Sequence, residues 1–197
     1  MADRNRLQLV LDAGGVLIGN LSPGFWQGMI DREDAGIAEL RAAFKQQIRE
    51  DLWTGRVGEE AFWQWVSGMF PEIEFAAAKS RLTERLHVLP AFHRVQEWSA
   101  AADVHILSNH RHEWLAPALE PLRPYVASVT ISSEAGCCKP GLPIYRLVQA
   151  RLRRGERVLF VDDAERNLQP ARDIGWETLL ADRDGRWVGL VDERLRQ

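Results

Sequence analysis

Five short apolar runs, separated by longer polar or mixed segments, mark the predicted strands of this chain. They cover residues 7–13, 104–109, 128–133, 157–163 and 177–181. Each of the last four follows a segment whose apolar residues recur with helical spacing, at residues 91–102, 113–122, 142–153 and 165–174. Strands that alternate with helices need crossover connections. We therefore predict an α/β fold, a doubly wound parallel sheet with helices on both faces.

The segment between the first two predicted strands, residues 20–90, has a different pattern. It is helical and unusually rich in large apolar side chains, namely Trp53, Phe62, Trp63, Trp65, Met69 and Phe70. These side chains supply more apolar surface than one crossover helix buries. We predict a core made of residues 1–19 and 91–197 and an inserted helical cap of residues 20–90. Most of the aromatic residues should form the cap's own core, and Trp26 is the one that we expect nearest a ligand.

Composition and charge restrict the classes of function. The chain has 197 residues with 46% apolar residues, enough for one core of ordinary size and a small insertion. A net charge of -3 gives no reason to expect nucleic acid or an anionic membrane as a partner. No apolar stretch is long enough to span a bilayer, and the N-terminus lacks the hydrophobic segment of a signal peptide. The two cysteines, Cys137 and Cys138, are neighbours and make no disulfide framework, so we predict a cytoplasmic protein. The oligomeric state stays open.

Polar side chains collect directly after four of the predicted strands. Ligands of open α/β sheets bind at the carboxyl ends of the strands, so we expect these side chains to form one site. A buried carboxylate is costly unless a cation compensates it, and an aspartate so placed can also act as a covalent nucleophile. The residues are Asp12 after the first strand, Ser108 and Asn109 after the second, Lys139 after the third, and Asp162, Asp163 and Asn167 after the fourth.

In order and spacing these groups resemble the motifs of the haloacid dehalogenase (HAD) superfamily of hydrolases. The resemblance covers nearly the whole chain: residues 12–17, a second motif ending at Ser108, the pair 139–140, and the pair 162–163 with Asn167. It implies a sheet in the order 3-2-1-4-5, which brings the first and fourth motifs side by side. It also implies a cap inserted just after the first motif.

The resemblance further implies a Mg²⁺ site, because three carboxylates and a backbone carbonyl form a hard-oxygen donor set. The implied ligands are Asp12, the Gly14 carbonyl, Asp163, and Asp162 either directly or through water. Asp12 would also be the nucleophile that forms an aspartyl-phosphate, in a phosphatase that acts on a small organic phosphate.

The remaining residues receive supporting roles from the same resemblance. Lys139 would offset negative charge and steady Asp12. Ser108, Asn109 and the backbone of the glycine turn, including Gly15, would hold the phosphate oxygens. Asn167 would support the carboxylates. A sugar phosphate is one candidate substrate, and Leu17, Ile18 and Asn20 should lie near the entrance with Trp26.

The chain departs from the family at Gly14. Most phosphatases of the family carry a second aspartate there, which protonates the leaving oxygen and then activates water. Such a group contributes typically 10²- to 10⁴-fold in rate. We expect a phosphatase in which substrate, water or another side chain takes over this role. The candidate side chains are His110, His112, Glu113, Glu50 and Asp51.

Other functions stay open at this stage. One is a catalytically weak or inactive binding or regulatory protein that keeps the fold and the metal. A second, less favoured, is a metal-independent haloacid dehalogenase; the dehalogenases carry a Tyr at the position of Gly14, and the pair Asp162 and Asp163 would repel Asp12 without a metal. Transfer of phosphate to an acceptor other than water is a third.

Overall fold

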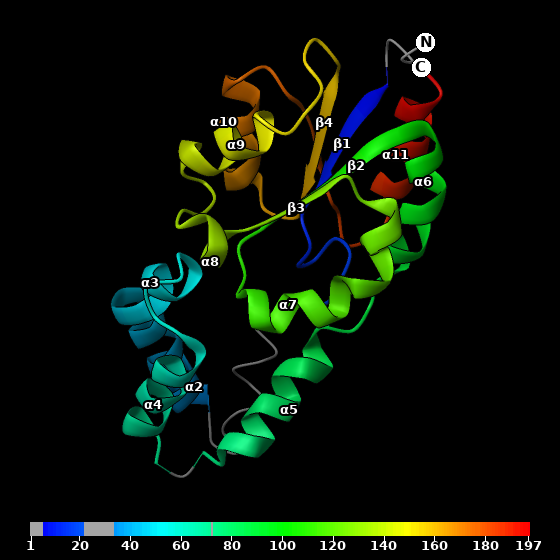
Figure 1. The fold of residues 1–197 in the computed structure, drawn as a ribbon. Coiled ribbons are helices and arrows are strands. Elements are labelled where there is room, and N and C mark those ends of the chain that lie inside the picture. The colour runs from blue at the N-terminus through cyan, green and yellow to red at the C-terminus, as the bar shows by residue number, and fades with distance from the viewer. Residues whose placement is uncertain (1–5, 22–33, 72) are drawn as a thin grey trace.

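The computed structural model describes residues 6–21, 34–71 and 73–197 and contains one five-stranded, all-parallel sheet (Figure 1). Its strands are β1 (Leu7–Leu11), β2 (Ala102–Ser108), β3 (Ser128–Ile131), β4 (Val158–Asp162) and β5 (Glu177–Leu180). They lie in the order β3-β2-β1-β4-β5, which confirms the predicted topology. The first and fourth motifs therefore follow neighbouring strands.

Helices cover both faces of the sheet, and the residues of β1 alternate between the two layers. Val10 packs in one apolar cluster with α9 (Leu142–Gln149) and α10 (Glu165–Asp173). Leu9 and Leu11 pack in the other, with α6 (Val95–Ala101) and α11 (Trp187–Leu195). Because side chains of a strand point to alternate faces, a strand buried on both sides is almost entirely apolar; the exception in β1 is Gln8, which is buried and donates to Asp103.

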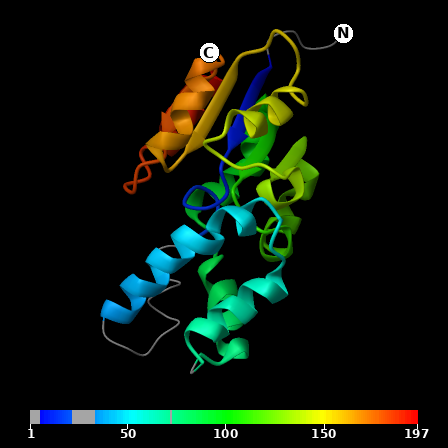
Figure 2. The same ribbon diagram turned by 90° about the vertical axis from the view of Figure 1, so that its left-hand side faces the viewer.

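The cap helices lie beyond the carboxyl ends of the strands in both views (Figures 1 and 2). We use this name for α2 (Asp34–Ala43), the π-helix η1 (Phe44–Ile48), α3 (Arg49–Trp53), α4 (Glu59–Met69) and α5 (Phe75–Arg85). The chain segments on either side of them run together: Gly19 N donates to His87 O at 2.8 Å and Leu89 N to Leu17 O at 2.9 Å. The division at residues 20 and 90 stays a prediction, and Trp26 lies outside the described residues.

Three predicted elements have different ends in the structure. The predicted helix 113–122 is α7 (His112–Leu119) followed by the 3-10 helix η3 (Glu120–Tyr125), which contains two prolines. The predicted helix 91–102 is the 3-10 helix η2 (Pro90–Arg94) followed by α6. The third predicted strand ends early, where the short helix α8 (Ser132–Ala135) begins.

The helix α11 was not predicted from the sequence. Its Trp187 ring lies 6.1 Å from the ring of Trp98, between centroids, and its Asp192 accepts a 2.7 Å hydrogen bond from Trp98 Nε1. Arg94 pairs with the same carboxylate at 2.9 Å. This helix thus completes the apolar layer over α6. No helix among the described residues has both the length and the apolar content needed to cross a membrane.

Candidate active site

Asp12 follows β1 directly and is buried, with 7% of its surface exposed. Its Oδ1 accepts a hydrogen bond from Ala13 N at 2.7 Å and lies 2.9 Å from Lys139 Nζ. Burial raises the pKa of Asp12 to about 8, against the lowering effect of Lys139, and the charges of Asp162 and Asp163 raise it further. The carboxylate therefore needs more positive charge than Lys139 alone supplies.

Of the two glycines that follow Ala13, Gly15 cannot be replaced without strain, whereas Gly14 has space for a side chain. Gly15 has φ +76°, and a Cβ built there would lie 2.3 Å from Asp163 Oδ2. A side chain at Gly15 would therefore displace the Asp163 carboxylate. At Gly14 an added Cβ meets only Asn20 Oδ1, at 3.7 Å. Packing thus leaves room for a side chain at the position where the family usually has an aspartate.

Lys139 joins the first and fourth motifs. Its Nζ lies 2.9 Å from Asp12 Oδ1 and 2.5 Å from Asp162 Oδ2, and the side chain is almost completely buried. Although burial lowers it, the charges of Asp12 and Asp162 raise the pKa of Lys139 above its usual value. Lys139 is therefore a fixed cation between two carboxylates.

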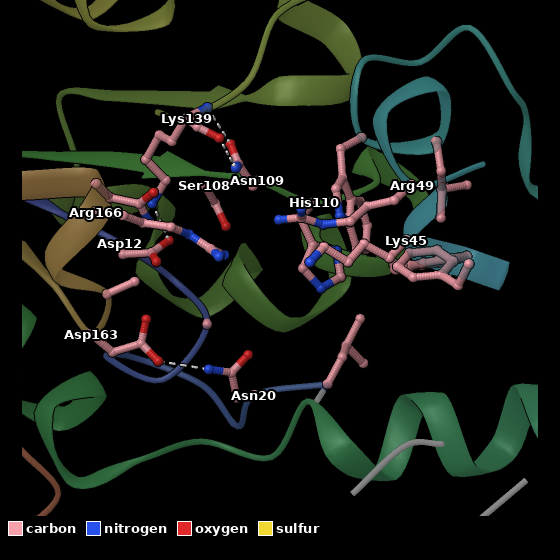
Figure 3. A pocket seen from close by; sticks show the side chains of 18 of the residues that line it. Asp12, Asn20, Lys45, Arg49, Ser108, Asn109, His110, Lys139, Asp163 and Arg166 are labelled. Carbon is pink, nitrogen blue, oxygen red and sulfur yellow. Dashed lines mark hydrogen bonds and ion pairs between the residues drawn. The ribbon is translucent and has the colours of Figure 1, made fainter. Parts of the chain in front are cut away.

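Asn109 holds the backbone of Lys139 through a reciprocal pair of hydrogen bonds. Its Nδ2 donates to Lys139 O at 2.7 Å, and its Oδ1 accepts from Lys139 N at 2.8 Å. Both ends of the amide are thus engaged in positioning the lysine, although Asn109 also lines the pocket. Ser108 also lines the pocket, with its hydroxyl beside Asp12 (Figure 3), and the roles of Ser108 and Asn109 in phosphate binding stay predictions.

The two carboxylates after β4 have different environments. Asp162 is fully buried, and its oxygens accept from Asn167 Nδ2 and Ala164 N, both at 2.9 Å, as well as from Lys139. Asp163 lines the pocket, and its Oδ2 accepts from Asn20 Nδ2 at 2.7 Å (Figure 3). Asp163 can therefore present a carboxylate oxygen to a ligand, whereas the hydrogen bonds of Asp162 mainly position Lys139, Asn167 and the backbone at Ala164.

Asp12, Asp162 and Asp163 could hold a metal ion. Each offers a carboxylate oxygen, and the three atoms lie within 4.8 Å of one another. Lys139 supplies one positive charge for these three carboxylates, and burial also raises the pKa of Asp163. An excess of buried negative charge with oxygen donors alone fits a divalent hard cation such as Mg²⁺. The predicted ligand set, including the Gly14 carbonyl, stays a prediction.

Among the five candidate acid–base side chains, His110 lies in the pocket and the other four do not line it. His112 pairs with Glu134, and Glu113 with Arg111. Glu50 and Asp51 both pair with Arg56 on the surface.

The environment of His110 favours a neutral ring with an unprotonated Nε2. Its Nδ1 donates to the carbonyl of Arg111 at 3.2 Å, so Nε2 of the neutral ring carries a lone pair, and Nε2 has no hydrogen-bond partner among the described residues. Burial lowers the pKa of His110 to about 4. In this state His110 can accept a proton or a hydrogen bond, but it is a poor general acid at neutral pH.

The pocket has a volume of about 450 Å³ and lies between the strand ends and the cap helices. Most of the cap residues that line the pocket were not predicted from the sequence. Three cations there are spaced four residues apart, a helical periodicity that could have indicated a shared face. The additional lining residues include Arg41, Phe44, Lys45, Arg49, Leu52, Trp53, Phe62, Trp114 and Arg166.

No protein-family model and no curated protein matches this chain. Solved structures do match it. A predicted HAD-like family hydrolase from Porphyromonas gingivalis is 22% identical with a TM-score of 0.77, covering 98% of each chain. The HAD family enzyme BT-2542 from Bacteroides thetaiotaomicron, in complex with magnesium and inorganic phosphate, is 17% identical with a TM-score of 0.77, over 94% of this chain and 99% of that one.

A third match is more distant in structure. The L-2-haloacid dehalogenase from Xanthobacter autotrophicus, with chloropropionic acid covalently bound, is 17% identical with a TM-score of 0.63, over 95% of this chain and 83% of that one. At these identities the matches establish the fold. The chain has the HAD-like hydrolase fold, which confirms at that level the resemblance drawn from its motifs.

Proposed function

We propose that this protein is a magnesium-dependent phosphatase that hydrolyses a small organic phosphate through an aspartyl-phosphate on Asp12. The observation that carries the proposal is the cluster of Asp12, Asp162 and Asp163 within 4.8 Å, with one buried lysine between the first two. The complex of the B. thetaiotaomicron enzyme with magnesium and phosphate supports the choice of ligands. In a metal-independent dehalogenase, Asp162 and Asp163 would repel the charged form of Asp12 with no cation to compensate them, which argues against that function.

The residues divide the chemistry as follows. Lys139 and Ala13 N hold Asp12 Oδ1, so Asp12 Oδ2, which receives no hydrogen bond from the described residues, is the oxygen placed to attack. Asp12, Asp163 and the Gly14 carbonyl would hold Mg²⁺, and Asp162 would act mainly through Lys139. The metal, when bound, supplies positive charge that lets the carboxylate approach a phosphate dianion. Ser108 would donate to a phosphate oxygen.

The reaction has two displacements at phosphorus. First, Asp12 Oδ2 forms a bond to phosphorus while the bond to the ester oxygen breaks, and the leaving alkoxide takes a proton from solvent. Second, water attacks the phosphorus of the aspartyl-phosphate, the bond to Asp12 breaks, and the proton released passes to solvent or to His110 Nε2. Because Gly14 supplies no carboxyl, good leaving groups should react fastest in the first step.

The cap, proposed as residues 20–90, would provide the wall that contacts the organic part of the substrate. Its α3–α4 connection already touches the core, where Arg111 Nη1 donates to Val57 O at 2.6 Å. The substrate would thus lie between the nucleophile and the aromatic and cationic side chains of the cap.

Hydrolysis of p-nitrophenyl phosphate tests the proposal, because its leaving group barely needs an acid. We expect turnover with Mg²⁺, loss of turnover with EDTA, and recovery when Mg²⁺ is added back in excess. Asp12→Asn should lower kcat by at least 10³-fold while the folded protein persists by circular dichroism.

Other outcomes would assign a different function. Absence of turnover despite calorimetric Mg²⁺ binding would overturn the phosphatase proposal and favour a binding protein. If the protein instead releases halide from 2-chloropropionate, and EDTA does not inhibit this reaction, the result would favour a dehalogenase similar to that of X. autotrophicus.

A further inference from the structure

We infer that the substrate carries a second anionic group, a carboxylate or a second phosphate, which Lys45 and Arg49 of the cap bind opposite Asp12. The inference deepens the proposed function and rests on it for the position of the scissile phosphate. Both side chains line the pocket, and Figure 3 shows them approaching from the cap side, opposite Asp12 and Asp163.

Their placement follows from the helices that carry them. Arg41, Lys45 and Arg49 succeed one another at intervals of four residues through α2, η1 and α3, and all three line the pocket. At about 1.5 Å rise per residue they extend over roughly 12 Å of the cap-side wall. Phe44 and Ile48 in the same segment are buried in the apolar core. The segment therefore packs on one side and presents cations on the other.

The charges of the pocket do not balance without a polyanionic ligand. The lining residues include five cations, Arg41, Lys45, Arg49, Lys139 and Arg166, and two carboxylates, Asp12 and Asp163. Of these cations, Lys139 is engaged by Asp12 and Asp162, while the three on the cap and Arg166 form no ion pair with a described residue. A bound Mg²⁺ would add two more positive charges. Counting the buried Asp162 with the two lining carboxylates, one phosphate dianion would still leave two positive charges unmatched.

Other basic side chains of the cap do have carboxylate partners. Arg56 pairs with Glu50 and Asp51 on the cap itself, and Lys79 pairs with Glu59. Lys45 and Arg49 have no such carboxylate partner among the described residues; Arg81 and Arg85 have none either, but only Lys45 and Arg49 of these four line the pocket. An arginine with a lysine beside it suits a carboxylate or phosphate, because charge-assisted hydrogen bonds to such groups are among the strongest in proteins.

The pocket also has room for such a molecule. Its volume of about 450 Å³ exceeds what a lone phosphate needs and lies in the ordinary range for small-ligand sites. Trp53 and Phe62 also line the pocket and offer apolar surface to the organic part of such a molecule. The substrate class is thus a compact phosphomonoester with a carboxylate or a second phosphate at the end away from the reacting phosphorus.

Matched pairs of substrates test the inference. Glycerol 3-phosphate is compared with 3-phosphoglycerate, which adds a carboxylate, and fructose 6-phosphate with fructose 1,6-bisphosphate, which adds a phosphate. We expect kcat/KM to be about tenfold or more higher for the more anionic member of at least one pair. The pair that responds identifies whether the cap binds a carboxylate or a phosphate.

The variant Lys45→Gln/Arg49→Gln should bring that ratio to within about twofold of one. A matched control, Arg81→Gln/Arg85→Gln, removes the same two charges from exposed positions of α5 that do not line the pocket, and should keep the wild-type ratio. A ratio near one in the wild-type protein, a ratio that survives in the first variant, or an equal loss in the control would overturn the inference.

A binding measurement separates this inference from the proposed function. Calorimetry of the four ligands with the Asp12→Asn protein in Mg²⁺ needs no turnover and should show the same preference, again lost in the Lys45→Gln/Arg49→Gln background. If the more anionic ligands bind more tightly but no phosphatase activity is found, the phosphatase proposal is overturned and the anion site is supported. If p-nitrophenyl phosphate is turned over but neither assay shows a preference for the more anionic ligand, the anion site is overturned and the phosphatase proposal is supported.

Discussion

Lys139 Nζ lies 2.9 Å from Asp12 Oδ1, and this contact joins the loop after β3 to the end of β1 inside the protein. Lys139→Met keeps a side chain of similar length but leaves two buried carboxylates without their cation. Removing one partner of a buried pair costs about 3–5 kcal/mol. We expect thermal unfolding to show a lower Tm and kcat for p-nitrophenyl phosphate to fall by about 10²-fold or more.

A specific electrostatic role has a signature beyond lost activity. Mg²⁺ should raise the Tm of Lys139→Met more than that of the wild type, because the ion then compensates the unmatched charge. The control is Lys79→Met, which removes an exposed pair with Glu59 and should change stability by less than about 1 kcal/mol. Equal Mg²⁺ shifts in all three proteins would contradict the role assigned to Lys139.

Gly14→Asp should increase activity on poor leaving groups. The position accepts a Cβ, whose nearest neighbour would be Asn20 Oδ1 at 3.7 Å. A carboxyl placed two residues after the nucleophile could protonate the leaving oxygen, a role typically worth 10²- to 10⁴-fold. We expect kcat for alkyl phosphates to rise by about tenfold or more, with a smaller change for p-nitrophenyl phosphate.

The matched control for that gain is Gly14→Ala, which introduces the Cβ without the carboxyl and should leave the alkyl-phosphate rate near the wild-type value. If the aspartate variant folds, binds Mg²⁺ and still gives no gain, then another group already supplies the proton. The pH profile of kcat would then identify that group.

The sheet and most of the site could be predicted from the sequence because both depend on local patterns. An apolar run followed by a polar residue marks the carboxyl end of a buried strand, and the alternation of such runs with helices predicts a parallel sheet. The strand order itself came from the resemblance of the motifs to the HAD superfamily. Asp12, Lys139 and Asp163 were thus expected in one place, and the structure brings them together.

The features that were missed depend on contacts between segments distant in the chain. The engagement of Asn109 with the Lys139 backbone cannot be inferred from residue type, since an asparagine amide binds phosphate and peptide groups equally well. The cap cations required knowledge of which face of α2 and α3 meets the core. The helix α11 is short, and its contacts with Trp98 and Arg94 lie more than 90 residues away.

Gly55→Ala should loosen the contact between the cap and the core. Gly55 has φ +78°, and a Cβ there would lie 2.1 Å from the backbone oxygen of Ser133. Both the backbone strain and the clash oppose the substitution, at a combined cost of about 1–3 kcal/mol. We expect a lower Tm and a higher KM for p-nitrophenyl phosphate, because Trp53 and Arg49 on the adjoining helix line the pocket.

The neighbouring Gly58 provides the control for this effect. It has φ -77°, and nothing lies within 4 Å of an added Cβ. Gly58→Ala should therefore leave KM near the wild-type value and lower stability only through the weaker N-cap of α4, by roughly 0.5–1 kcal/mol. Similar KM values for both variants would show that the Gly55 contact does not position the cap-side wall.

Protonation of His110 should make stability fall in mild acid. Burial lowers the pKa of His110 from 6.5 to about 4, so as the pH decreases the unfolded chain binds a proton before the folded protein does. The stability present above pH 6.5 is therefore lost as the pH falls towards 4, by roughly 2 kcal/mol between pH 7.5 and pH 5. Urea unfolding at the two pH values measures this decrease in the free energy of unfolding. In the His110→Gln variant the decrease should be smaller by about 2 kcal/mol. An unchanged pH dependence in that variant would mean that His110 titrates normally, and its Nε2 would then be available as an acid as well as a base.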